Sequence, residues 1–153
     1  MMLRWLLASF HLLGLGVGLG AVWARGRGLK GALDTGGLRR VFLADSLWGL
    51  AALLWIGTGL WRLLAGTEKP TGYYLHNHIF MTKMGLLIAI LILEVWPMST
   101  LLRWRARVGR GELPDTAVAP LLARISFAQA WIVVLMVFAA TAMARGINFS
   151  SGS

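Results

Sequence analysis

The sequence predicts an all-α polytopic membrane protein: an antiparallel up-down-up-down bundle of four transmembrane helices with both termini outside. Of its 153 residues, 58% are hydrophobic and only 14% are charged, whereas a soluble protein has about a quarter charged residues. Four apolar runs each exceed the ~20 residues that cross a bilayer as a helix. They cover residues 3–24, 41–65, 79–102 and 120–144. We therefore expect one transmembrane domain over residues 1–147 and a polar, disordered tail over 148–153.

The first run resembles a secretory signal peptide in one respect, because Arg4 precedes an apolar stretch. The stretch is longer than the apolar core of a signal peptide, and the residues around Trp23 and Arg25 make a poor cleavage site. We therefore expect a retained transmembrane helix.

Short connections separate the four runs. They read GRGLKGALDTGG, GTEKPTG and GRGELPDTAVAP, and each contains glycine or proline where a helix would stop. Because such short connections allow no long crossover, successive helices are predicted to be antiparallel neighbours.

Basic residues are concentrated at one end of the predicted bundle. The first and third connections are richer in lysine and arginine than the second connection and the termini, so the positive-inside rule predicts that both termini face outward. In a bacterial cell the chain would lie in the cytoplasmic (inner) membrane. The formal charge of +9 then meets anionic membrane lipid and implies no nucleic acid. The basic residues at this end are Arg25, Arg27, Lys30, Arg39, Arg40, Arg103, Arg105, Arg107, Arg110 and Arg124.

The first run carries a histidine above a strip that lacks bulky side chains. Gly14 and Gly18 follow His11 at positions i+3 and i+7, on the same helical face. One interpretation is close helix packing through small residues, with His11 hydrogen-bonded to a neighbouring helix. The other is a haem site, in which His11 ligates the iron and the glycines leave room for the macrocycle. The spacing leaves both interpretations open.

Polar residues inside the other runs need partners, because ionisable groups are costly in a membrane. Lys83 and Glu94 lie eleven residues apart, close to three helical turns, so they share a face. Lys83 either belongs to a reaction site or snorkels to the outer interface. Asp45 and Glu94 are expected to form arginine–carboxylate pairs that fix helix contacts, with a proton path as the alternative. Candidate partners at similar depth are Trp48, Gln129, Arg103 and Arg124.

Soft metal ligands gather at the second connection. His76 and His78 lie close to Met81 and Met84, and thioethers with imidazoles are the ligands that copper(I) selects. Methionine is also an ordinary filler of a hydrophobic core. The chain has no cysteine, which excludes disulfides and thiolate metal sites. A copper(I)-binding or transport protein is therefore one function that stays open.

Two segments carry a family resemblance: LRRVFLADSLWGLAALLWIGTGLWRLL and YYLHNHIFMTKMGLLIAILILEVWPMSTLLRWR. They resemble the bacterial integral-membrane family catalogued as domain of unknown function 2214, and the likeness covers nearly the whole chain. That family has no established activity. The resemblance therefore implies the four-helix architecture and no mechanism.

A more distant resemblance is to the HemJ-type protoporphyrinogen oxidases, four-helix membrane proteins associated with haem b. The matching positions include His11 in the first helix, the Arg39–Arg40 pair that opens the second, and Lys83 that opens the third. The resemblance implies that His11 ligates haem iron and that Lys83 is the polar group at the reaction site. The family's Asn-Glu-x-Pro motif is replaced here by ARISFAQAW. Haem binding is therefore implied more strongly than porphyrinogen oxidation.

Three functions follow from these observations. The first is a membrane oxidoreductase with haem b, for which a porphyrin or a membrane quinone would be the small-molecule partner. The second is a non-enzymatic accessory or assembly subunit, whose partner would be a second copy of the chain or another membrane protein. The third is the copper(I) protein.

Overall fold

The computed structural model describes residues 2–64 and 78–144, and it confirms the predicted all-α fold. The described residues form four helices: α1 (Met2–Lys30), α2 (Thr35–Leu64), α4 (His78–Gly109) and α5 (Ala119–Ala144). All four are long and apolar enough to cross a membrane. α1 and α4 continue for several residues beyond the predicted runs, into the basic segments. The predicted tail, residues 148–153, lies outside the described residues, as does the second connection with His76.

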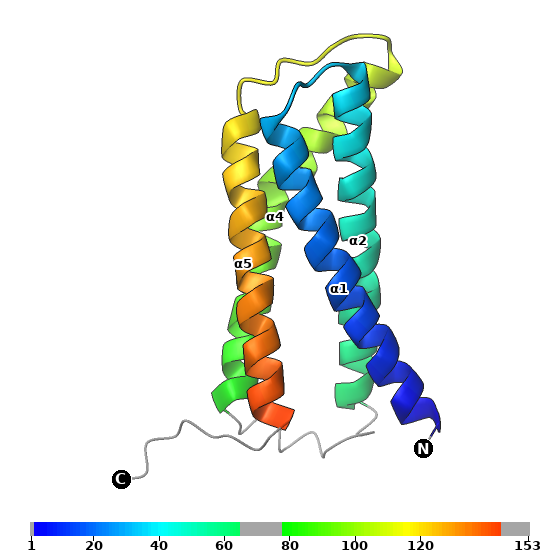
Figure 1. Cartoon of the computed structure of the whole chain (residues 1–153), viewed down its shortest axis with the longest axis vertical. Helices are drawn as coiled ribbons and strands as arrows, with labels where there is room; N and C mark the ends of the chain where they lie inside the picture. Colours follow the sequence, from blue (N-terminus) through cyan, green and yellow to red (C-terminus); the bar gives the residue numbers. More distant parts are fainter. Residues whose placement is uncertain (1, 65–77, 145–153) are drawn as a thin grey trace.

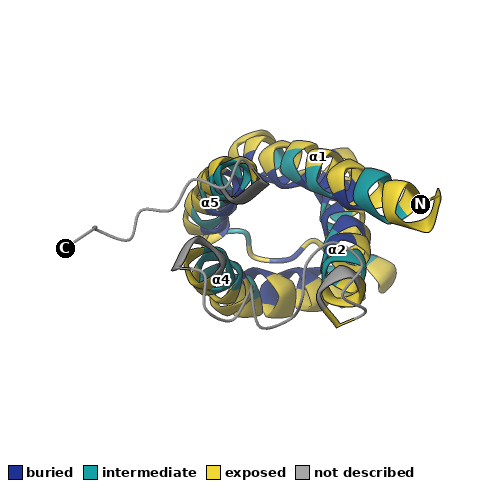
Figure 2. Cartoon of the chain, turned by 90° about the horizontal axis from the view of Figure 1, so that it is seen from below, coloured by how far each residue is buried: buried dark blue, intermediate teal, exposed yellow. Residues whose placement is uncertain are grey.

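The helices form an antiparallel ring. Successive helices run in opposite directions, as predicted (Figure 1). Seen along the bundle, they follow one another in the order α1, α2, α4, α5, with buried residues turned inward (Figure 2). α1 packs against α2 and α5, and α4 packs against α5, whereas α2 and α4 make few direct contacts. We call the end where α1 and α4 end and α2 and α5 begin the arginine-rich end. The side of the membrane that this end faces stays a prediction from the loop charges.

Two hydrophobic clusters fill the ring. One lies at mid-height and includes Trp48 and Met136, and the other lies at the arginine-rich end and includes Leu38, Leu101 and Leu122. Each cluster takes residues from all four helices, so the bundle is packed at both levels. On every helix at least one charged or polar residue lies between the residues of one cluster and those of the other.

The turn between α1 and α2 is capped by Asp34. Its side-chain oxygen accepts a hydrogen bond from the backbone N–H of Gly37 at 2.7 Å, and its carbonyl accepts one from the N–H of Leu38 at 2.9 Å. Gly37 lies directly against the carbonyl group of Ala32. The tight reversal therefore depends on the absence of a side chain at position 37.

Gly37→Ala is expected to lower the free energy of unfolding by roughly 1–3 kcal/mol, because a Cβ there would overlap the carbonyl oxygen of Ala32. Gly36→Ala is the matched control, since its Cβ would meet the Asp34 carboxylate at an ordinary 3.7 Å. Thermal unfolding of the two variants in one detergent measures the difference. Equal unfolding temperatures would contradict this turn geometry.

Candidate functional site

A buried arginine lies at the centre of the bundle. Arg25 is 0% exposed, although it is only five residues from the end of α1. A guanidinium has five N–H groups, and each one here donates a hydrogen bond to another helix. The acceptors are Ser126 Oγ (3.0 Å from Nε), Asp45 Oδ1 (2.9 Å from Nη1), Glu94 Oε1 (2.9 Å from Nη1), Glu94 Oε2 (3.1 Å from Nη2) and Gln129 Oε1 (2.6 Å from Nη2).

Glu94 on α4 is the main acceptor for this arginine. Its two oxygens receive two parallel bonds from Arg25, the bidentate geometry that makes charge-assisted hydrogen bonds strong. Glu94 Oε2 also accepts from the indole N–H of Trp48 at 3.1 Å and from the side-chain amide of Gln129 at 2.9 Å. The same amide donates to the carbonyl of Ile90 at 3.1 Å. Donors from three helices therefore converge on one carboxylate.

Asp45 on α2 bridges two arginines. Its Oδ1 accepts from Arg25, and its Oδ2 accepts from Arg105 Nη2 at 3.1 Å. Arg105 also donates to the carbonyl of Phe42 at 2.8 Å, and its guanidinium lies 5.1 Å from the centroid of that ring. The Arg105 side chain is 34% exposed, so it lies at the rim of the cluster. The Arg25 network is defined here as Arg25, Asp45, Trp48, Glu94, Arg105, Ser126 and Gln129.

The Arg25 network is neutral in formal charge and connects every helix. Two guanidiniums face two carboxylates. The Trp48–Glu94 and Asp45–Arg105 bonds join α2 to α4, the neighbouring helices that pack least directly. Because an unpaired charge is costly inside a membrane, a fully paired network favours this one arrangement of the helices.

A glycine next to Arg25 lets α1 and α5 approach at this level. A Cβ at Gly26 would lie only 2.9–3.1 Å from ring carbons of Phe127, so a side chain there would push the helices apart. The close approach brings Arg25 within hydrogen-bonding distance of both Ser126 and Gln129 on α5. The glycine at position 26, the close approach of α1 to α5 and the hydrogen bonds from Arg25 to α5 therefore lie at the same level of the bundle.

The sequence identified the carboxylates but not the cations. The structure brings Asp45, Glu94 and Gln129 together, as predicted. The predicted cations Arg103 and Arg124 are wrong, because both are exposed and neither pairs with these carboxylates in the described part of the chain. The cations are Arg25 and Arg105, which the loop charges indicate only as basic residues at one end of the bundle.

The sequence contains a periodic pattern that indicates that Arg25 lies on the buried face of α1. His11, Gly14, Gly18, Ala21 and Arg25 follow one another at alternating intervals of three and four residues, and all five are buried. The buried face of α1 therefore extends past the apolar run and includes a charge. Ser126 carries no comparable signal, since a single serine in an apolar helix often bonds its own backbone, as Ser126 does at 3.0 Å with the carbonyl of Leu122.

His11 and Lys83 meet around one tryptophan, nearer the opposite end of the bundle. The His11 ring stacks on Trp55 with centroids 5.2 Å apart, and Lys83 Nζ lies 5.7 Å from the centroid of that indole. His11 Nδ1 is 3.0 Å from the carbonyl oxygen of Trp55 and 3.0 Å from Thr58 Oγ1. Because a carbonyl only accepts, Nδ1 carries the hydrogen, and Nε2 is the basic nitrogen of the neutral ring.

The space next to the two glycines that follow His11, Gly14 and Gly18, is occupied by α2. A Cβ at Gly14 would lie 3.2 Å from the backbone nitrogen of Trp55 and 3.3 Å from the carbonyl oxygen of Ala51. A Cβ at Gly18 would lie 3.5 Å from Ala51 and from Trp48. Gly14 and Gly18 therefore allow the backbones of α1 and α2 to approach each other. This agrees with the first of the two interpretations, close helix packing through small residues.

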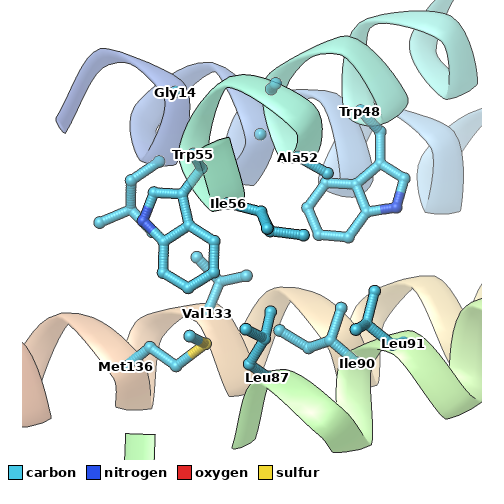
Figure 3. A pocket seen from close by; sticks show the side chains of 13 residues that line it. Gly14, Trp48, Ala52, Trp55, Ile56, Leu87, Ile90, Leu91, Val133 and Met136 are labelled. Carbon is cyan, nitrogen blue, oxygen red and sulfur yellow. The ribbon is translucent and has the colours of Figure 1, made fainter. Parts of the chain in front are cut away.

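The interior contains a small apolar cavity between the two tryptophans (Figure 3). Its volume is about 40 Å³, and it is lined by apolar side chains from all four helices. Pockets for drug-sized ligands have about 300–1,000 Å³. A haem does not fit here in this arrangement, because the glycine strip and the cavity leave no slot for a macrocycle. Haem b binding stays a prediction.

The copper(I) prediction rests mainly on residues that the structure does not describe. His76 lies outside the described residues, and so does the side chain of His78. Met81 is exposed on α4. Within residues 2–64 and 78–144, no group of three or more histidine, aspartate or glutamate side chains has the geometry of a metal site.

Comparison with known families identifies a match over most of the chain. The model of a family described as "Predicted membrane protein (DUF2214)" matches residues 3–148. No curated protein and no solved structure matches the chain, so the resemblance to HemJ-type proteins stays a prediction.

Proposed function

Because the chain belongs to the DUF2214 family of membrane proteins, whose description names no activity, we propose a function that rests on the bundle itself. The chain acts as a non-enzymatic accessory or assembly subunit in a membrane. Its buried polar residues serve to hold four helices in one register. The bundle is then a rigid, lipid-embedded component for other membrane proteins.

The observation that carries this proposal is the complete use of the Arg25 donors. A catalytic or transport site needs a polar group that can turn to a substrate, whereas all five N–H groups of Arg25 are held by side chains of other helices. Glu94 is held in the same way by Arg25, Trp48 and Gln129. A buried centre in which every Arg25 donor is used rigidifies a core, which is what a structural subunit requires.

Native mass spectrometry of the protein, released gently from the membranes of its own cell, tests this proposal. The expected species contain the 16.7 kDa chain, further protein chains in fixed stoichiometry, and lipid. Those further chains would be copies of the same protein or other membrane subunits. A monomer that carries one equivalent of haem, porphyrin, quinone or copper would contradict the proposal.

A second candidate, a haem b redox protein, is favoured by the orientation of His11. Histidine ligands usually donate their other ring N–H to a carbonyl, as His11 Nδ1 does to Trp55. The nearby Lys83 would supply a cation for a haem propionate. The indole N–H of Trp55 is also buried without an acceptor among the described residues, as a donor to a bound group would be. Haem would supply one-electron chemistry, but α2 has to move away from Gly14 before it can bind.

His11→Ala separates the two candidates. For an accessory subunit we expect a lower free energy of unfolding, by about 1 kcal/mol for the hydrogen bond that is lost, and no change in the visible spectrum. Lys83→Ala is the companion variant, because it alters the same cluster without removing a candidate iron ligand. Spectra are recorded after reconstitution with haem b in mild detergent. A Soret band that is present in the parent protein and in Lys83→Ala but lost in His11→Ala would favour the redox candidate.

A further inference from the structure

A second, polar cavity lies at the arginine-rich end, outside the Arg25 network. Its volume is about 220 Å³, below the ~300–1,000 Å³ of pockets for drug-sized ligands, so it suits a small polar group. One face of α4 supplies most of its wall, and the connection from α4 to α5 supplies the rest. The lining residues that matter for the argument are Trp96, Thr100, Arg103, Trp104, Arg107 and Asp115.

The cavity lies at the depth of lipid head groups. Arg103 and Arg107 come one and five residues after the apolar run 79–102, so they lie about 2 and 8 Å beyond its end at 1.5 Å per residue. Trp96 and Trp104 both line the cavity, about two turns apart on α4, and Trp104 is buried in the cluster at the arginine-rich end. Trp96 is 39% exposed and offers an apolar wall on the side of the hydrocarbon.

The two arginines in this cavity have no carboxylate partner among the described residues. The ion pairs among the described residues belong to Arg25 and Arg105, and none involves Arg103 or Arg107. Within the described ranges, the side chain of Arg103 makes one long hydrogen bond, 3.5 Å to the hydroxyl of Thr100, which is 3% exposed. Unlike Arg25, these guanidiniums are therefore available to an external anion.

The charge of the cavity matches a singly charged anion. Asp115 lines the same space, and one of its oxygens accepts the backbone N–H of Ala117 at 3.0 Å. Two arginines and one aspartate give the lining a formal charge of +1. A phosphodiester carries one negative charge, whereas inorganic phosphate carries between one and two at neutral pH.

We propose that this cavity binds the phosphodiester of an anionic glycerophospholipid in the adjacent leaflet. Arg103 and Arg107 hold the phosphate oxygens, since the guanidinium fork suits bidentate phosphate binding. Trp96 packs against the glycerol and the first carbons of the acyl chains. Basic pockets beside transmembrane helices bind anionic lipid in the same way. The proposal is independent of the accessory-subunit function.

The test is lipid retention by the full-length protein. The protein is reconstituted in nanodiscs of phosphatidylcholine with 20% phosphatidylglycerol, released into mild detergent, and analysed by native mass spectrometry for bound lipid. We expect preferential retention of phosphatidylglycerol, reduced roughly 10- to 30-fold in the double variant Arg103→Gln/Arg107→Gln, since each basic residue contributes about 1 kcal/mol. Circular dichroism confirms that the variant is folded.

Arg39→Gln/Arg40→Gln is the matched control. It removes two exposed arginines from the start of α2, at the same end of the bundle and with the same change in charge, and neither residue lines the cavity. Retention close to that of the parent protein is expected. Equal loss in both double variants, or no loss in either, would overturn the proposed site. Displacement of the lipid by 1 mM inorganic phosphate would also overturn it, because the site would then take a soluble anion.

Discussion

Replacing Arg25 with leucine is expected to lower the free energy of unfolding by about 3–5 kcal/mol, because two carboxylates lose their buried cation. Five hydrogen bonds to other helices, at about 0.6 kcal/mol each in a membrane protein, give about 3 kcal/mol. Unfolding in mixed detergent micelles, followed by tryptophan fluorescence, measures the loss.

Arg27→Leu is the control for this variant. Arg27 lies two residues later on the same helix and is exposed, so its replacement removes the same charge without touching the Arg25 network. A change of at most about 0.5 kcal/mol is expected for this exposed residue. Similar losses in Arg25→Leu and Arg27→Leu would show that the buried position of Arg25 has no energetic consequence.

Glu94→Leu is expected to have the next largest effect, a loss of about 2–4 kcal/mol. The variant leaves Arg25 with one carboxylate, Asp45, and removes the acceptor of the Trp48 indole N–H. The effect is smaller than that of Arg25→Leu because Gln129 keeps its bond to the carbonyl of Ile90 and Asp45 keeps both arginines.

The same micelle titration measures this variant, with Glu112→Leu as its control. Glu112 is an exposed residue of the connection between α4 and α5, and its carboxylate forms no ion pair with the described residues. We expect little change in the control. A fluorescence change specific to Glu94→Leu is also expected, because Trp48 loses its hydrogen bond. Unfolding midpoints for Glu94→Leu that equal those of the parent protein would contradict the account.

The sequence predicts the spans and the antiparallel order because both follow from the hydrocarbon thickness and from short connections. It also identifies Asp45 and Glu94, since a carboxylate inside an apolar run needs a partner. It does not identify Arg25 as that partner. An arginine at the end of a span is indistinguishable from an interfacial loop residue until the packing of α1 turns it inward.

The glycine strip shows a different limit of sequence reasoning. Gly14 and Gly18 indicate that something approaches α1 closely, but a missing side chain does not say what. Only the packed bundle shows that the neighbour is the backbone of α2 at Ala51 and Trp55. The shared contact of His11 and Lys83 with Trp55 depends on how α2 and α4 rotate, which the sequence does not show.

A double-mutant cycle between Arg25 and Glu94 tests the central claim most directly, namely that the buried polar residues form one cooperative unit that holds the four helices. Unfolding free energies are measured for Arg25→Leu, Glu94→Leu and the double variant in the same micelles. The account predicts that the double variant loses about 2–3 kcal/mol less than the sum of the single losses, because each charge is costly only when its partner is missing. Additive losses would contradict it, since the two residues would then act independently.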